Sequence, residues 1–228
     1  RSPTDMGVNR AGFGIVDDAA VREAGSQEIV RRYFRYACEH AMGLVDRETV
    51  QRLELLMHQL GLAPERRSVV APAREAAARA QEKDKGHDGI YCGAAIELPD
   101  GTVVTGSNSP LLHASAALVL NGAKRLAGLP RELDLLPPSV IQALGHLKTE
   151  VLGGRRVSLD AEEALIALAV SATSSPAADA AVSRLKELRG CEVHMTHMPT
   201  PGDEAGLRKL GVNLTSEPDF ATKHLFAG

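Results

Sequence analysis

The first 86 residues have apolar positions at a helical period. Apolar residues recur there at three- and four-residue steps, which is typical of amphipathic helices packed on a core. The opening stretch 1–14 has no such period and is rich in Gly, Asn, Asp and Pro, which indicates a loop. A polar run at 81–88 indicates a solvated linker. The predicted helices span about 18–44, 47–60 and 64–82.

After residue 86 strands alternate with helices. Residues 90–98 and 102–105 are predicted to be two short strands around Asp100-Gly101, a dipeptide favoured in two-residue hairpin turns. Ser109 as N-cap and Pro110 at the first helical position predict that a helix begins directly after the hairpin. The pattern further predicts helices at 138–151, 160–170, 176–188 and 204–210, and strands at 133–136, 191–196 and 212–215.

This alternation predicts the fold class. Interleaved strands and helices are typical of α/β proteins, and 228 residues suffice for one large domain or two small ones. We expect a loop and helical segment over residues 1–86, followed over 87–228 by a three-layer α/β sandwich. Its mixed sheet is expected to open with the hairpin.

Composition and charge limit which kinds of partner and which cellular compartment are expected. A net charge of −3 and an aromatic share of 3%, with no Trp, disfavour nucleic acid as a partner. No apolar run reaches the roughly 20 residues of a membrane span, so no membrane association is expected. Cys38, Cys92 and Cys191 form no closely spaced pair, which favours a reducing compartment and predicts a cytoplasmic protein.

The sequence contains no strong catalytic or metal motif. His194 and His197 are expected on opposite faces of a strand, where they cannot share an ion, and no His-Glu-x-x-His or Cys-x-x-Cys is present. Cys92 and Cys191 lie in apolar strand-like runs and are expected to be core residues. No metal is therefore predicted, and no motif identifies a cofactor.

Two polar patches are candidate ligand sites. Asp5 and Asn9 lie beside glycine in the opening loop, where they either form turns, or bind a ligand or line an interface. Asn108 and His113 lie between the hairpin and the next helix, whose free amides favour an anion. The alternative is that Ser109 only caps the helix and that His113 only packs in its first turn.

Long strings of this sequence resemble a bacterial family of uncharacterised proteins. The resemblance is carried by residues 1–12, 15–19, 95–106 and 210–218 and covers essentially the whole chain. It implies that the chain is the C-terminal half of a protein about twice as long, in agreement with a start at Arg1 rather than Met. It also implies that any nucleotide-handling glycine-rich loop lies in the missing N-terminal half.

The element order of residues 89–218 is similar to the cytidine-deaminase-like fold. In that fold a His-x-Glu and a Pro-Cys-x-x-Cys hold zinc and supply a proton-transferring Glu. The matching places here read His113-Ala-Ser115 and Pro137-Pro-Ser-Val140, so only the histidine is kept. The resemblance therefore implies the layout without its zinc chemistry.

Two functional hypotheses follow. In the first, the chain is a non-catalytic domain that packs on the missing N-terminal half and supports assembly into a homo-oligomer through its alanine-rich helices. In the second, it is part of an enzyme whose nucleotide or phosphate site is shared with that half. Asp5, Asn9, Asn108 and His113 would then line the pocket.

Overall fold

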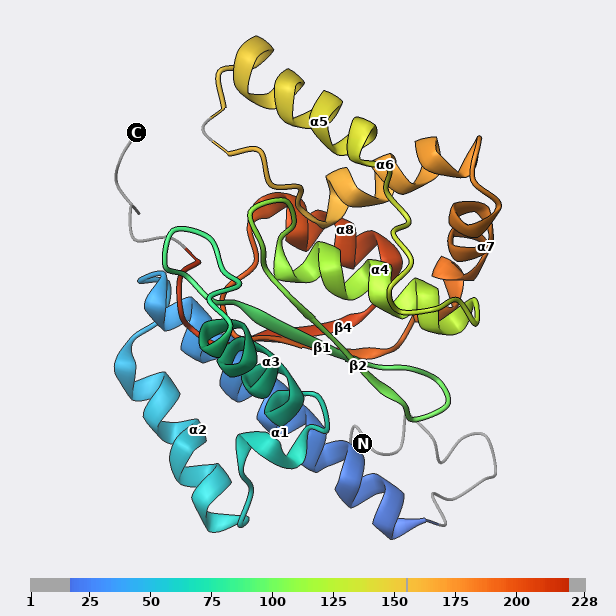
Figure 1. Cartoon of the computed structure of the whole chain (residues 1–228). Helices are drawn as coiled ribbons and strands as arrows, with labels where there is room; N and C mark the ends of the chain where they lie inside the picture. The colour runs from blue at the N-terminus through green and yellow to red at the C-terminus, as the bar shows by residue number, and fades with distance from the viewer. Residues whose placement is uncertain (1–16, 155, 222–228) are drawn as a thin grey trace, which may run out of the picture.

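The computed structural model describes residues 17–154 and 156–221, in which one sheet is covered by helices on both faces (Figure 1). Within these residues the sheet has four strands in the order β2-β1-β3-β4. Strand β1 pairs antiparallel with β2 and β3, whereas β3 and β4 are parallel. The predicted α/β fold with a mixed sheet opened by a hairpin is therefore confirmed. The strands are β1 (Gly93–Glu97), β2 (Val103–Ser107), β3 (Glu192–Met195) and β4 (Asn213–Ser216).

Helices α1 and α3 contact one face of the sheet, and α2 packs against α1. Helix α4 contacts the opposite face and is backed by α6, α7 and α8 (Figure 1). The helices before residue 86 thus form one outer layer of the sandwich, while a domain boundary at that point stays a prediction. The α-helices are α1 (Asp18–Ala41), α2 (Arg47–Gln59), α3 (Val70–Glu82), α4 (Ala114–Leu126), α5 (Pro138–His146), α6 (Ala161–Ala172), α7 (Pro176–Arg184) and α8 (Pro201–Leu210).

Two strand glycines let helices approach the sheet closely. A Cβ atom on Gly93 would overlap the backbone of α3 at Ala73, and one on Gly106 would overlap the backbone of α4 at Leu118. Buried alanines line both sides of these contacts, so the layers lie near each other with little side-chain volume between them. The alanine-rich composition therefore serves close packing of helices on the sheet.

The helix start predicted at Ser109 and Pro110 is wrong. The Ser109 hydroxyl accepts hydrogen bonds from the amides of Leu111 and Leu112 and forms a local turn, and α4 begins only at Ala114. Leu112 lies in a parallel bridge with Leu159, and this pairing keeps the chain extended up to the helix. A tertiary contact thus overrides the local capping signal.

Other boundaries also differ from the prediction, and three of them involve a change of element type or a shift at a helix start. Residues 133–136 form turns rather than a strand, and Leu135 and Leu136 are buried against the helices around α4. The third predicted helix begins as a 3₁₀ turn at Pro64–Arg66, and α3 itself begins at Val70. Helix α8 begins at Pro201, three residues before its predicted start.

Candidate functional site

A cavity of about 50 Å³ lies at the end of the sheet where β1 begins and β2 and β3 end. This volume is room for a few water molecules or one small ligand group. The wall includes the N-terminal ends of α4 and α8, together with residues from the loops before β1 and α6. Polar residues from segments far apart in the sequence therefore face one space: His87, Asn108, His113, Arg156, His197 and Asp203.

The central pair in this cavity is His113 and Asp203. His113 occupies the N-cap position of α4 but makes no side-chain capping bond. Its Nδ1 instead lies 2.8 Å from Oδ2 of Asp203, in the first turn of α8. Thr200 caps that helix and forms a capping box with Asp203, which fixes the position of the carboxylate.

Asp203 is a buried carboxylate with several hydrogen-bond donors. It is 2% exposed, and it accepts hydrogen bonds from the hydroxyls of Ser115 and Thr200 and from the backbone amide of Ala161. Burial alone would raise its pKa, but the hydrogen bonds from His113, Ser115 and Thr200 outweigh burial and lower the pKa below its ordinary value. Asp203 is therefore ionised at neutral pH.

The ionised carboxylate determines the tautomer of His113. A carboxylate can only accept hydrogen bonds, so the proton of a neutral His113 must lie on Nδ1. Nε2 then carries a lone pair, and it makes no hydrogen bond to residues 17–154 or 156–221. A histidine held in this way, on a cavity wall, is able to accept a proton at Nε2 and to return it.

Other groups of the wall set the polarity of the cavity. Burial lowers the pKa of His197, which favours its neutral form. Burial also raises the pKa of Cys92 to about 12, so its thiol is a poor nucleophile at neutral pH. Arg156 lines the same cavity and supplies a positive charge. These residues suit binding and proton transfer better than thiol chemistry.

The structure brings two of the four predicted ligand residues together. Asn108 and His113 line the same cavity. The Asn108 side chain accepts from the amide of Cys92 at 2.8 Å and donates to the carbonyl of Ile90 at 2.9 Å, so it fixes the entry into β1. Asp5 and Asn9 lie outside the described residues.

Asp203 is not among the site residues predicted from the sequence. The pattern Thr200-Pro-Gly-Asp203 is a helix-start signal, and it would have placed the beginning of α8 correctly. No local signal, however, relates Asp203 to His113, which lies 90 residues earlier.

A second polar cluster lies on the other face of the sheet, beneath α1. His194 is fully buried and packs against the ring of Phe34, and its Nδ1 lies 2.9 Å from Oγ1 of Thr215. The Arg67 guanidinium, 1% exposed, also bonds Thr215 and forms an ion pair with Glu192 at 2.6 Å. These groups are bonded to one another and buried, so we assign them a structural role.

His194 lies in β3 and contacts α1, whereas His197 lies two residues beyond the end of β3 and lines the cavity, so the prediction that both belong to one strand is wrong for His197. Over the described residues, no group of three or more His, Cys, Asp or Glu side chains is placed to hold a metal ion. No helix in this part of the chain is long and apolar enough to cross a membrane.

Comparison with known proteins gives two family matches. Residues 65–226 match the C-terminal model of the domain of unknown function DUF1846, and residues 1–61 match its N-terminal model. The prediction that the chain is a C-terminal half is therefore not supported in that form, because its first 61 residues match the N-terminal model. These matches show no relationship to cytidine deaminases, and that layout stays a prediction.

Individual relatives agree with the family matches. The chain is 43% identical over 226 residues to a UPF0371 protein of Clostridium botulinum, and 41% and 42% identical to UPF0371 proteins of Clostridium tetani and Clostridioides difficile. Each match covers 99% of this chain and 45% of the relative, so the chain spans less than half of the relatives' length. The chain belongs to the DUF1846 family, whose members include the UPF0371 proteins of these bacteria.

Proposed function

We propose that this chain carries the acid–base site of an enzyme, with His113 as the proton-transferring group. The observation that supports the proposal is the 2.8 Å contact between Nδ1 of His113 and the buried carboxylate of Asp203, which leaves Nε2 without a partner among the described residues, on the wall of the cavity. A histidine that serves only as a helix cap would bond the helix amides, and His113 does not.

The ligand that fits best is a small molecule with a phosphate group. Arg156 and the amides at the start of α4 favour an anion near His113, and the cavity volume suits one such group rather than a whole nucleotide. This assignment agrees with the phosphate or nucleotide site expected as one alternative from the sequence.

The roles of the residues follow from their positions. Nε2 of His113 would take a proton from a hydroxyl or amine of the ligand and return it at the end of the reaction. Asp203 would stabilise the resulting imidazolium and hold the ring orientation, and so acts through His113 as a positioning residue. Asn108 would keep the wall of the cavity in place.

The test compares the unaltered chain with His113→Asn. An asparagine amide nitrogen takes the place of Nδ1 and still donates to Asp203, whereas the proton-accepting Nε2 is lost. Binding is measured as the change in melting temperature on addition of inorganic phosphate or adenosine monophosphate. Chloride at the same ionic strength is the reference. We expect phosphate to raise the melting temperature and to perturb the ¹⁵N signals of His113.

His40, which is exposed at the end of α1, is the matched control for these NMR signals. If phosphate and adenosine monophosphate leave the His113 signals and the melting temperature unchanged, the proposed ligand class is wrong. If Nε2 carries the proton of the neutral ring, the assigned acid–base role is wrong.

Assembly is the second candidate function. Large apolar side chains are exposed on the helical segment that ends at Val151 and on the neighbouring α6, where Val151 is 64% and Ile166 57% exposed. Exposed apolar groups on neighbouring helical segments favour association, here with a second copy of the chain. Sedimentation of the chain over a range of concentrations tests this association. Ile166→Glu should shift the equilibrium between dimer and monomer toward the monomer. A monomer at every concentration would contradict it.

A further inference from the structure

The outer edge of β2 forms a border of the sheet. β2 pairs with β1 on one side, and within the described residues no strand pairs with its other side. An open edge presents unpaired N–H and C=O groups, to which another extended chain can bond.

The pairing register shows which residues of β2 face outward. Leu98 donates to the carbonyl of Thr102 at 2.9 Å, and Asn108 donates to that of Cys92 at 3.1 Å. In an antiparallel ladder the bonded pairs alternate, so Val104 and Gly106 bond to β1, whereas the residues between them do not. The outward-facing main-chain groups therefore belong to Val103, Thr105 and Ser107.

The contact of Asn121 in α4 agrees with this register. Its side-chain amide donates to the Thr105 carbonyl at 3.0 Å, which places that carbonyl on the outer side of the strand. The amide of Thr105 and the polar main-chain groups of Val103 and Ser107 remain on this edge.

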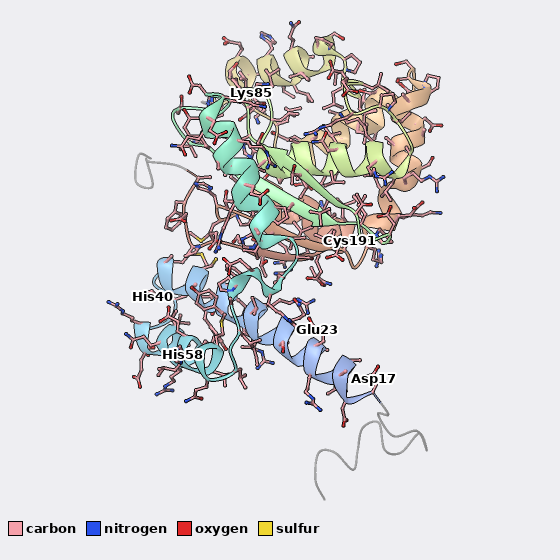
Figure 2. The ribbon with its side chains drawn as sticks, turned by 60° about the horizontal axis from the view of Figure 1, so that its bottom comes forward. Asp17, Glu23, His40, His58, Lys85 and Cys191 are labelled. Atoms are coloured by element: carbon pink, nitrogen blue, oxygen red, sulfur yellow. The ribbon has the colours of Figure 1, made fainter. Side chains whose placement is uncertain are left out.

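Two adjoining hollows of about 250 and 190 Å³ follow the same edge and share Thr105, Asn121 and Arg131. Their walls contain six basic side chains and no carboxylate or aromatic ring among the described residues. The basic side chains come from α3, the segment after it, α4 and the loop that follows: Arg79, Lys83, Lys85, Lys124, Arg125 and Arg131. Figure 2 labels Lys85 just beyond the end of α3.

Most of this positive charge is not paired within the described part of the chain. Arg79 is bonded to Glu75 at 3.3 Å and Arg125 lies 3.5 Å from Asp100, both exposed pairs. Lys83, Lys85 and Arg131 form no ion pair with described residues. The chain as a whole has a net charge of −3, so this edge is a local region of positive charge on an acidic protein.

We propose that the outer edge of β2 binds an acidic polypeptide segment in extended conformation, which adds a further strand to the sheet. The main-chain groups of Val103 and Ser107 and the amide of Thr105 would bond the segment, and the basic side chains would pair with its carboxylates. A polypeptide fits better than a nucleic acid, because main-chain groups recognise an extended backbone and no aromatic ring is present for base stacking.

Basic residues at a sheet edge also have a protective role in some proteins, where they prevent association between edges. If the basic residues only protect the edge, no extended peptide should bind to β2, whether the peptide is acidic or not. The two roles are therefore separable by experiment.

The test uses the full chain and a fluorescein-labelled octapeptide of alternating Val and Glu. A twin peptide with N-methyl groups on every residue keeps the charge but has no N–H group on either edge for strand pairing. Fluorescence anisotropy should show binding of the first peptide and at least about tenfold weaker binding of the twin. Amide hydrogen exchange at Thr105 should slow when the first peptide is added.

Charge variants complete the test. Lys83→Glu combined with Arg131→Glu should weaken binding about tenfold or more, while Lys186→Glu, an exposed cation far from this edge in the chain, should leave it unchanged. Absence of peptide binding, equal binding of the N-methylated twin, or stronger binding of a single-stranded oligonucleotide would each overturn the proposal. The peptide comparisons use the unaltered chain, so they hold even if a variant fails to fold.

Discussion

Nδ1 of His113 at the start of α4 lies 2.8 Å from Oδ2 of Asp203 in the first turn of α8. The carboxylate is buried and ionised, so it holds the proton of the ring on Nδ1 and leaves Nε2 with a lone pair. This contact joins two helices that are separated by 90 positions in the chain. It therefore contributes both to the stability of the fold and to the chemistry we propose for the cavity.

Replacing Asp203 with Asn should destabilise the protein. The amide cannot accept as many hydrogen bonds as the carboxylate, and the hydroxyl of Ser115 and the amide of Ala161 lose a charged acceptor. We expect the free energy of unfolding in urea to fall by about 2 to 3 kcal/mol. Asp179→Asn, at an exposed position in the first turn of α7, should change it by less than about 0.5 kcal/mol. Equal losses would contradict the role of Asp203.

The same carboxylate should make stability depend on pH. Its pKa in the folded protein is below the ordinary value of 3.8, so its contribution is complete above that pH. As the pH falls below 3.8, Asp203 of the unfolded chain takes up a proton before Asp203 of the folded protein does. The stability that this carboxylate contributes therefore decreases progressively and is fully lost once the pH is below the folded pKa. Unfolding free energies from about pH 6 to pH 2.5 should therefore drop more steeply for the unaltered protein than for Asp203→Asn. If the unaltered protein and Asp203→Asn have parallel pH profiles, Asp203 does not cause the loss of stability at low pH.

Two glycine substitutions should have opposite effects. Gly93→Ala places a methyl group against the backbone of α3 and should destabilise the protein by about 1 to 3 kcal/mol. Gly25→Ala adds a methyl group to the exposed side of α1, where nothing lies within 4 Å, and should stabilise it by about 0.5 to 1 kcal/mol. Thermal unfolding measures both changes, and a loss of stability in both variants would be inconsistent with the packing described.

Arg67 should be far more important for stability than an exposed arginine. Arg67→Ala removes a buried guanidinium that bonds Glu192 and Thr215 and should cost about 2 to 3 kcal/mol. Glu192 keeps its ion pair with Arg31, so its charge is not left without a partner. Arg52 pairs with Glu48 on the surface of α2, and Arg52→Ala should cost no more than about 0.5 kcal/mol. Urea unfolding of the two variants checks the comparison. Similar values for both would mean that the Arg67 network contributes little.

The sequence by itself determined the features that depend on a few neighbouring residues. The capping box at Asp160 and the Ser175-Pro176 helix start are both confirmed, because a side chain that bonds an amide two or three residues later needs no distant partner. The hairpin around Asp100-Gly101 is also confirmed, but its turn is longer than the two residues predicted. Leu98 pairs with Thr102, which leaves a three-residue loop whose last residue, Gly101, has a φ of +79°.

Only the tertiary structure decided where α4 begins and which polar groups meet. Ser109 had a good local capping signal, but pairing of Leu112 with Leu159 kept the chain extended and delayed the helix to Ala114. The contact of His113 with Asp203 depends on the path of the chain between two helices, which no local pattern encodes. Hydrophobic period and capping act over one or two turns, whereas a site is formed by the packing of distant segments.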